Sequence, residues 1–342
     1  MSAIPVLILF GPTASGKTAI LEELFIPGNY PAGNNLHGQT PKNTCLKAEI
    51  ISADSMQVYK GMDIGTAKPS RETQAKIPHH LIDIKSPAQQ FNAGEFVRLA
   101  ENAIRSADKN SALPVVSGGT GFYLRNLIMG LPAAPPPDPQ IRNDLKAELT
   151  KNGTAALISE LKEKDPVSAA RIHPNDEYRL LRALEVIRQT SQPLSYFAQN
   201  GSAAGAAQRS PFRFLVLGLK REREDLYKRI NERCSQMFRG GLAAEARQLF
   251  DAGFTPNDPG LKAIGYNEFF IRDPADPNKF TFTADLEGAQ ALIAQNSRRY
   301  AKRQMVFFKN IPDVIWIDGT DPHRASQEIR ILLEGFLEEI YH

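Results

Sequence analysis

The sequence predicts an α/β protein, in which a parallel sheet is covered by helices on both faces and interrupted by an inserted helical segment. Three observations lead to this class. An apolar run at 4–10 is followed directly by the loop GPTASGKT at 11–18 and then by a helical pattern. Further apolar runs alternate with helical periodicity, which is typical of βαβ units and hence of a parallel sheet. Residues 140–200 carry helical patterns such as Leu180, Leu184 and Ile187.

The predicted strands are short runs rich in apolar residues. The first is apolar on both faces, as expected of a fully buried strand. Between the third and fourth strands, Phe96, Ala100, Ala103 and Ile104 recur at helical spacing. We expect parallel strands at 4–10, 48–54, 80–84, 113–118, 212–219 and 314–318. We expect core helices at 18–25, 221–239, 242–252 and 284–309, and a closing helix that runs to 342.

Changes in composition mark the boundaries of the inserted segment. A stiff proline-rich connector, LPAAPPPDP, occupies 131–139, and a linker of small residues occupies 199–210. We therefore expect a catalytic core formed by 1–130 and 211–342, and an inserted helical domain at 131–210. Residues 28–46 are rich in Gly, Asn, Pro, Thr and Lys, which predicts an exposed loop.

The bulk composition excludes several classes of protein. The chain has 342 residues, 42% of them hydrophobic and 23% charged, as in an ordinary globular protein, and its net charge is +3. The two cysteines, Cys45 and Cys234, form no C-x-x-C pattern, so we expect neither a zinc site nor a disulfide. No run approaches the roughly 18 apolar residues that span a bilayer. We expect a monomeric, cytoplasmic protein without a membrane partner.

The loop at 11–18 is the strongest local signal for function. It matches G-x-x-x-x-G-K-[ST], in which backbone N–H groups and a helix N-terminus converge on a phosphate. A P-loop NTPase-like sheet is the expected fold. By this pattern Lys17 adds a positive charge, and Thr18 can ligate Mg²⁺. The expected phosphate-binding residues are Gly11, Pro12, Thr13, Ala14, Ser15, Gly16, Lys17 and Thr18. The motif alone points most directly to ATP.

Polar residues follow the other predicted strands. Asp54 and Asp83 both lie at strand ends, where ligands bind in parallel sheets. Each carboxylate suits the acidic residue that holds Mg²⁺ through water. Taken alone, Asp54 also suits a general base or a helix N-cap. A second glycine loop, SGGTG at 117–121, offers the Thr120 hydroxyl at a helix N-terminus, and there too a simple N-cap is the alternative.

Basic residues gather in the last third of the chain. The stretch RRYAKRQMVFFK at 298–309 has five basic residues and no acidic one, with aromatic residues interleaved. This combination suits phosphate contact plus stacking on unpaired bases, so we expect an anionic partner there. The basic residues of 220–239 are partly balanced by acidic ones, which favours a solvated face for that helix.

Five motifs, in this order and spacing, carry a resemblance that covers residues 4–318. They are GPTASGKT, DSMQVYKGMDIGTAKP, GGTGFYLR, ARIHPNDEYRLLRALEV and AKRQMVFFK. Together they closely resemble the tRNA isopentenyltransferase family, whose bacterial members are tRNA dimethylallyltransferases. The second and fourth motifs are specific to that family.

The resemblance implies a reaction and roles for individual residues. It implies transfer of a dimethylallyl group from dimethylallyl diphosphate to N6 of adenosine 37 beside the tRNA anticodon. Asp54 would be the general base, Thr120 and Arg298 would contact the diphosphate, and Mg²⁺ would assist at Thr18. The helical domain would hold the anticodon stem-loop. The implied tRNA contacts are Asp54, Ser55, Met56, Gln57, Thr120, Arg142, Tyr178, Arg179, Leu180, Leu181 and Arg182, together with the segment 261–266.

This chain departs from the family pattern at two places. Family members often carry an arginine where Lys262 or Ala263 stands, and the 28–46 segment is longer than usual.

Three alternatives remain open from the residues alone. A small-molecule kinase or ATPase would use the same loop but leave the helical insertion without a role. An adenylate prenyltransferase acting on free nucleotides would not need a module that grips the anticodon. A nucleotide-dependent RNA-binding protein without catalysis would keep its function after substitution of Asp54.

Overall fold

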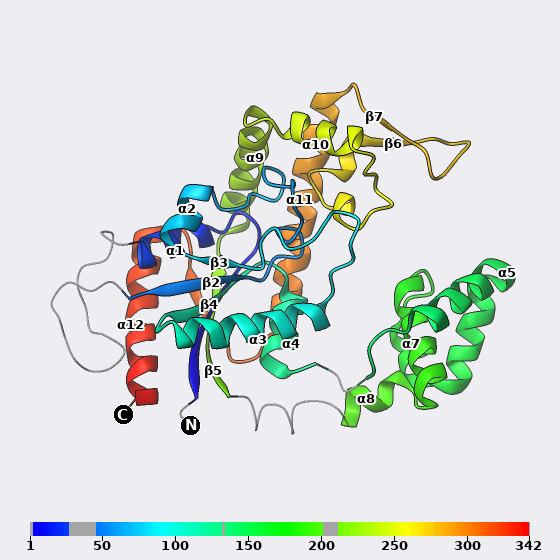
Figure 1. Ribbon diagram of the computed structural model, residues 1–342, viewed down its shortest axis with the longest axis horizontal. Coiled ribbons are helices and arrows are strands. Elements are labelled where there is room, and N and C mark those ends of the chain that lie inside the picture. Colours follow the sequence, from blue (N-terminus) through cyan, green and yellow to red (C-terminus); the bar gives the residue numbers. More distant parts are fainter. Residues whose placement is uncertain (1–2, 27–45, 132–133, 201–210, 342) are drawn as a thin grey trace. The chain divides into compact units, whose positions relative to one another are not determined.

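The computed structural model describes residues 3–26, 46–131, 134–200 and 211–341, and its central element is a six-stranded parallel sheet (Figure 1). The strand order is β3-β2-β4-β1-β5-β8, so the strand that precedes the phosphate loop lies inside the sheet. The strands are β1 (Ile4–Phe10), β2 (Ala48–Ser52), β3 (His79–His80), β4 (Leu113–Gly118), β5 (Phe212–Lys220) and β8 (Ile315–Asp318). The predicted α/β class is confirmed.

Helices cover both faces of the sheet. On one face, Leu7 and Leu9 belong to a core shared with α1 (Lys17–Phe25) and α12 (Pro322–Tyr341). On the other face lie α3 (Ala93–Lys109) and α11 (Leu286–Phe308), where Phe10 meets Phe308 with ring centroids 4.8 Å apart. Because successive side chains of a strand point to opposite faces, a strand apolar on both sides requires two helical layers.

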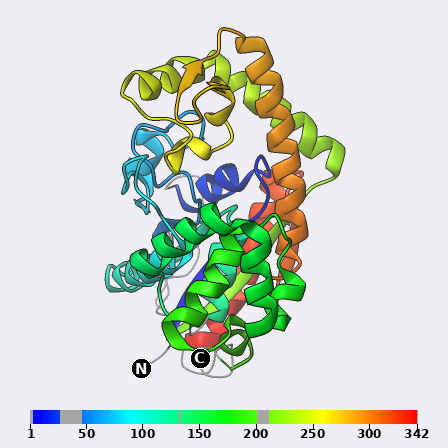
Figure 2. The same ribbon diagram turned by 90° about the vertical axis from the view of Figure 1, so that its right-hand side faces the viewer.

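A smaller layer surrounds the N-terminal part of α11. It contains α9 (Arg223–Arg239), α10 (Leu242–Asp251) and an antiparallel pair, β6 (Phe270–Arg272) and β7 (Phe280–Phe282) (Figures 1 and 2). Sequence periodicity predicted both helices but neither short strand. The helix expected to begin after Thr120 is α4 (Gly121–Met129), whereas α2 (Arg71–Lys76), η1 (Gly260–Lys262) and η2 (Asn267–Phe269) had no sequence prediction.

The predicted strand at 80–84 is wrong beyond its first residue. The chain leaves the sheet at Leu81, which has φ 62°, and Asp83 also lies in the left-handed region, with φ 56°. The Asp83 carboxylate accepts a hydrogen bond from the buried Lys68 ammonium at 2.5 Å. This ion pair holds Asp83 in a turn, so it is not a strand-end ligand as the sequence allowed.

The chain divides into two compact units, Met1–Arg125 with Pro211–His342, and Asn126–Ser210. The described part of the second unit contains the end of α4 and the helices α5 (Pro139–Lys164), α6 (Pro166–Arg171), α7 (Glu177–Thr190) and α8 (Leu194–Asn200). Its own core includes Leu145, Leu157, Leu161 and Leu184. The predicted loop at 28–46 lies outside the described residues except for Leu46, as does the linker at 199–210 beyond Asn200. Of the described helices, none is long and apolar enough to cross a membrane.

Glu185 is a fully buried carboxylate in the second unit. Its oxygens accept a hydrogen bond from the Asp138 backbone N–H at 2.7 Å and from the Arg142 guanidinium at 3.1 Å. Arg182 completes the ion pair at 3.3 Å. The Asp138 N–H and the Arg142 guanidinium thus connect the start of α5 to Glu185 of α7.

We expect Glu185→Ala to destabilise the second unit by about 3 kcal/mol, because removal of one partner leaves buried charges uncompensated. Faster amide hydrogen exchange in α5 and α7 and a lower urea midpoint would report the loss. The exposed Glu163→Ala, also in this unit, is the matched control and should stay within about 0.5 kcal/mol of wild type. Equal effects of the two substitutions would contradict a structural role for Glu185.

Candidate active site

The phosphate loop forms between β1 and α1 because its glycines accept geometry that other residues resist. Gly16 has φ +99°, in the left-handed region. A Cβ at Gly11 would lie 2.7 Å from Ser15 Oγ, so only glycine permits this close turn. The Ser15 N–H donates to the Pro12 carbonyl at 3.2 Å, which closes the loop.

Some backbone N–H groups of the loop donate hydrogen bonds to other groups of the protein, and others remain free at the cavity. Thr13 N–H donates to Gln304 Oε1 at 3.0 Å, and Ser15 N–H is used inside the loop. Within the described residues, the N–H groups of Ala14, Gly16, Lys17 and Thr18 have no acceptor. Four free donors at the N-terminus of α1 form a cradle for an anion.

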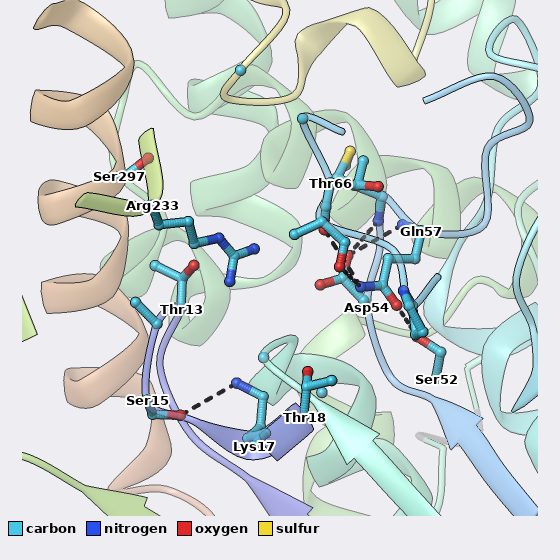
Figure 3. Close-up of a pocket in the computed structure, with 18 of the residues that line it drawn as sticks. Thr13, Ser15, Lys17, Thr18, Ser52, Asp54, Gln57, Thr66, Arg233 and Ser297 are labelled. Atoms are coloured by element: carbon cyan, nitrogen blue, oxygen red, sulfur yellow. Dashed lines mark hydrogen bonds between the residues drawn. The ribbon is translucent and has the colours of Figure 1, made fainter. Parts of the chain in front are cut away.

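Two cations face each other across this cradle (Figure 3). Lys17 Nζ bends back and donates to the carbonyls of Gly11 at 2.8 Å and Pro12 at 3.0 Å. Burial, followed by the charge of Arg233, lowers the pKa of Lys17 to about 7. Burial also lowers the pKa of Arg233, which points into the cavity from α9, and the Asp54 charge partly offsets that shift.

Helix α9 contributes more than its sequence indicated. Arg229 and Arg233 are one turn apart and both line the cavity, so the expectation of a solvated face is wrong for these two residues. Arg229 Nε also donates to the Ala14 carbonyl at 3.0 Å, and Arg221, before the helix, donates to the Ser15 carbonyl at 2.9 Å. The signal in the sequence that could have revealed them is the i,i+4 spacing of Arg229 and Arg233, which places both side chains on one face of α9.

Asp54 faces the cradle from the segment after β2 (Figure 3). Its Oδ1 accepts hydrogen bonds from the backbone N–H groups of Met56 at 2.8 Å and Gln57 at 3.3 Å, which fixes the carboxylate. Gln57 is itself held, because it accepts from Ser52 Oγ at 2.9 Å. Asp54, Ser55, Met56 and Gln57 all line the same cavity as the phosphate loop.

The second glycine loop supports this segment from β4. A Cβ at Gly118 would lie 2.2 Å from the Ala53 carbonyl oxygen, so these two backbone segments are in close contact there. Thr120 N–H donates to the Ala53 carbonyl at 3.1 Å, and Thr120 Oγ1 accepts from the Ser55 N–H at 3.1 Å. Thr120 therefore contacts the Asp54 segment and is not itself part of the cavity lining.

The cavity has a volume of about 700 Å³ and is lined by residues from distant parts of the first unit. Helix α11 contributes Ser297, Tyr300, Arg303 and Gln304, whereas Arg298 donates to Asn231 and does not line the cavity. The 261–266 segment contributes Lys262, Ala263, Ile264 and Gly265. Pockets of this size hold small ligands.

The lining is compatible with Mg²⁺ bound through phosphate. The described residues contain no cluster of three or more His, Cys, Asp or Glu that could hold a metal. Mg²⁺ at phosphate sites needs only one or two protein oxygens, because water and phosphate fill its other positions. Thr18 is exposed on the first turn of α1, and Asp54 lines the same cavity.

The residues expected to contact tRNA in the second unit divide into three groups. Tyr178 is 70% exposed, and the Arg179 side chain is 73% exposed. Leu180 and Leu181 are buried in the core of that unit. Arg142 and Arg182 hold Glu185, and the Arg142 guanidinium also stacks 4.8 Å from the centre of the Tyr178 ring.

The parallel sheet and the glycine-rich loop between β1 and α1 define an α/β protein of the P-loop type. Residues 57–311 match the sequence profile of the IPP transferase family, and the chain belongs to that family. A tRNA dimethylallyltransferase from Geobacter sulfurreducens is 39% identical over 93% of each chain, and one from Bacillus licheniformis is 37% identical over 98% of each.

One solved structure agrees with this membership, and a second shares the fold. The crystal structure of a tRNA isopentenylpyrophosphate transferase from Bacillus halodurans is 36% identical, with a TM-score of 0.62 over 98% of this chain and 97% of that one. A eukaryotic dimethylallyltransferase that acts on tRNA, at 24% identity, shares the fold with a TM-score of 0.76 over 98% of this chain and 80% of that one.

The lowered pKa of Lys17 predicts a pH-dependent stability. Lysine in the unfolded chain titrates near 10.5, so between about pH 7 and 10.5 the unfolded state binds more protons than the folded state. Stability therefore rises with pH in this window. The free energy of unfolding of wild type minus that of Lys17→Met should therefore increase from pH 7 to 9, by up to about 1.4 kcal/mol per pH unit.

Urea unfolding followed by the fluorescence of Trp316 is the appropriate measurement, since this sole tryptophan lies in β8 of the first unit. Comparison of the two proteins at each pH cancels the titration of all other groups. A difference that stays constant from pH 7 to 9 would contradict a buried, partly neutral Lys17.

Proposed function

We propose that this protein transfers a dimethylallyl group from dimethylallyl diphosphate to N6 of adenosine 37 in tRNA, with release of diphosphate. The observation that carries the proposal is the anion cradle of Ala14–Thr18 opposite the Asp54 carboxylate in one cavity. Family membership supports it, as do relatives named tRNA dimethylallyltransferase. Such an enzyme would act as a monomer in the cytoplasm.

In the proposed reaction, Asp54 removes a proton from the adenine amino group as the bond between N6 and the allylic carbon forms. The bond between that carbon and the diphosphate oxygen breaks at the same time, and the electron pair leaves with the diphosphate. Proton removal by a positioned base typically contributes about 10²–10⁴-fold. It is useful here because an exocyclic amine is a poor nucleophile.

The leaving diphosphate gains negative charge, and the cradle is suited to stabilise it. Free N–H groups, Lys17 and Arg233 are preorganised around one anion site. Bound Mg²⁺, held by Thr18, would add positive charge at the diphosphate oxygens. Arg298 was expected in this role, but it does not line the cavity, whereas Arg229, Arg233 and Arg303 do.

The second unit is the proposed binding site for the anticodon stem-loop. Its exposed Tyr178 and Arg179 offer an aromatic ring and a cation at the start of α7, a combination that suits unpaired bases and phosphates. The target adenosine lies in a loop, where unstacking a base costs only a few kcal/mol. The alternatives of a small-molecule kinase and an adenylate prenyltransferase would leave this unit without a function.

The decisive experiment incubates the purified protein with labelled dimethylallyl diphosphate, Mg²⁺ and unmodified tRNA. Label in an anticodon-loop adenosine is the expected outcome, and it should disappear when EDTA removes the metal. ATP hydrolysis without transfer would identify a kinase or an ATPase. Label on free AMP or ATP alone would identify an adenylate prenyltransferase.

Asp54→Asn should lower the single-turnover rate of transfer by about 10²–10⁴-fold, because the amide cannot accept the proton. Binding of tRNA, measured by filter retention, should change by less than about threefold. Asp251→Asn, an exposed aspartate on α10, is the matched control and should transfer at the wild-type rate. A catalytically normal Asp54→Asn protein would remove Asp54 from the mechanism.

A further inference from the structure

Gln304 of α11 is a buried amide between the two glycine loops, with only 6% of its surface exposed. Its Oε1 accepts a hydrogen bond from the Thr13 N–H at 3.0 Å, and its Nε2 donates to the Gly119 carbonyl at 2.8 Å. One partner needs an acceptor and the other a donor, so the orientation of the amide is determined. Glutamate would lack the donor, and lysine would lack the acceptor.

The two partners of this amide belong to opposite sides of the proposed reaction. Thr13 is part of the loop that forms the diphosphate cradle. Gly119 precedes Thr120, whose N–H and hydroxyl hold Ala53 and Ser55 on either side of Asp54. A single side chain therefore connects the leaving-group loop to the segment that carries the base.

The fit around this amide is tight. A Cβ at Gly119 would lie 2.4 Å from Gln304 Nε2, so glycine is required for the contact. Tyr300, one turn earlier on α11, lines the same cavity. Burial and the charge of Asp54 raise the pKa of Tyr300 to about 12, so the phenol stays protonated at neutral pH.

We propose that Gln304 is a positioning residue that sets the separation between the diphosphate cradle and the Asp54 carboxylate. This inference rests on the function proposed above. By occupying the Thr13 N–H, Gln304 also confines the cradle to the N–H groups from Ala14 onward. Its loss should therefore alter the approach of the base to the substrate more than the binding of diphosphate.

The test compares wild type with Gln304→Met, which fills a similar volume but makes neither hydrogen bond. The single-turnover rate of prenyl transfer should fall roughly 10- to 100-fold, because a misplacement of about 1 Å can cost this much. The Kd for magnesium pyrophosphate, measured by calorimetry, should change less than threefold. Gln290→Met is the matched control on the same helix, where Gln290 bonds Ser235 outside the cavity lining, and it should leave both values unchanged.

The pH dependence of the transfer rate of Gln304→Glu is a second test, because a purely structural role predicts no such dependence. The neutral acid can donate to the Gly119 carbonyl, whereas the carboxylate cannot. Its transfer rate relative to wild type should therefore increase severalfold as the pH falls from 8 to 6, while the same ratio for Gln304→Met stays flat. If Gln304→Met does not fold, this profile decides the question.

A wild-type rate in Gln304→Met would overturn the positioning role, as would equal losses of rate and pyrophosphate affinity. A flat pH profile for Gln304→Glu would overturn it too. In each case the wild-type protein still transfers the prenyl group, so the proposed function stands. Absence of transfer by the wild type would overturn the proposed function and this role together.

Discussion

The parallel register of three neighbouring strands is the constraint on which the rest of the site depends. Phe10 of β1 lies opposite Gly118 of β4, and Ser52 of β2 lies opposite Ser117. All three strands therefore end at the same level of one sheet edge. The phosphate loop, the Asp54 segment and the second glycine loop begin there within a few residues of one another. Strand pairing thus brings the cradle and the carboxylate to the same end of the sheet.

The positive charges around the cavity are held more by hydrogen bonds to backbone carbonyls of the phosphate loop than by ion pairs. Arg221 and Arg229 donate to carbonyls of the phosphate loop, and Lys17 does the same from within the loop. These bonds turn loop carbonyls toward the cations and leave N–H groups facing the cavity. Burial then makes each cation less stable in its charged form, as the lowered pKa values of Lys17 and Arg233 indicate. An anion bound in the cradle would stabilise the charged forms of both side chains. The arrangement that lowers the stability of the folded protein without an anion therefore favours anion binding.

Local signals in the sequence predicted the sheet, the phosphate loop and Asp54, because a strand, its glycine turn and the next helix are neighbours in the chain. Residues delivered by distant helices were harder to assign. Arg298 and Arg303 are five positions apart on α11, about 140° around the helix, so only one of them faces the cavity. Gln304 carries no charge and no periodic signal, and its two partners lie 291 and 185 residues away. The predicted strand at 80–84 failed because the Lys68–Asp83 ion pair is a tertiary contact that overrides local β propensity.

The position of β5 in the sheet has a consequence for the order of events during synthesis. β5 lies beside β1, yet about 200 residues separate them in the chain, and the entire second unit is translated in between. Until Phe212–Lys220 emerges from the ribosome, β1 has one unpaired edge, and such edges invite association with other chains. The helical unit depends mainly on contacts within its own segment and can fold during that interval. In nascent chains of this topology, the helical unit can therefore be complete before the central sheet is closed.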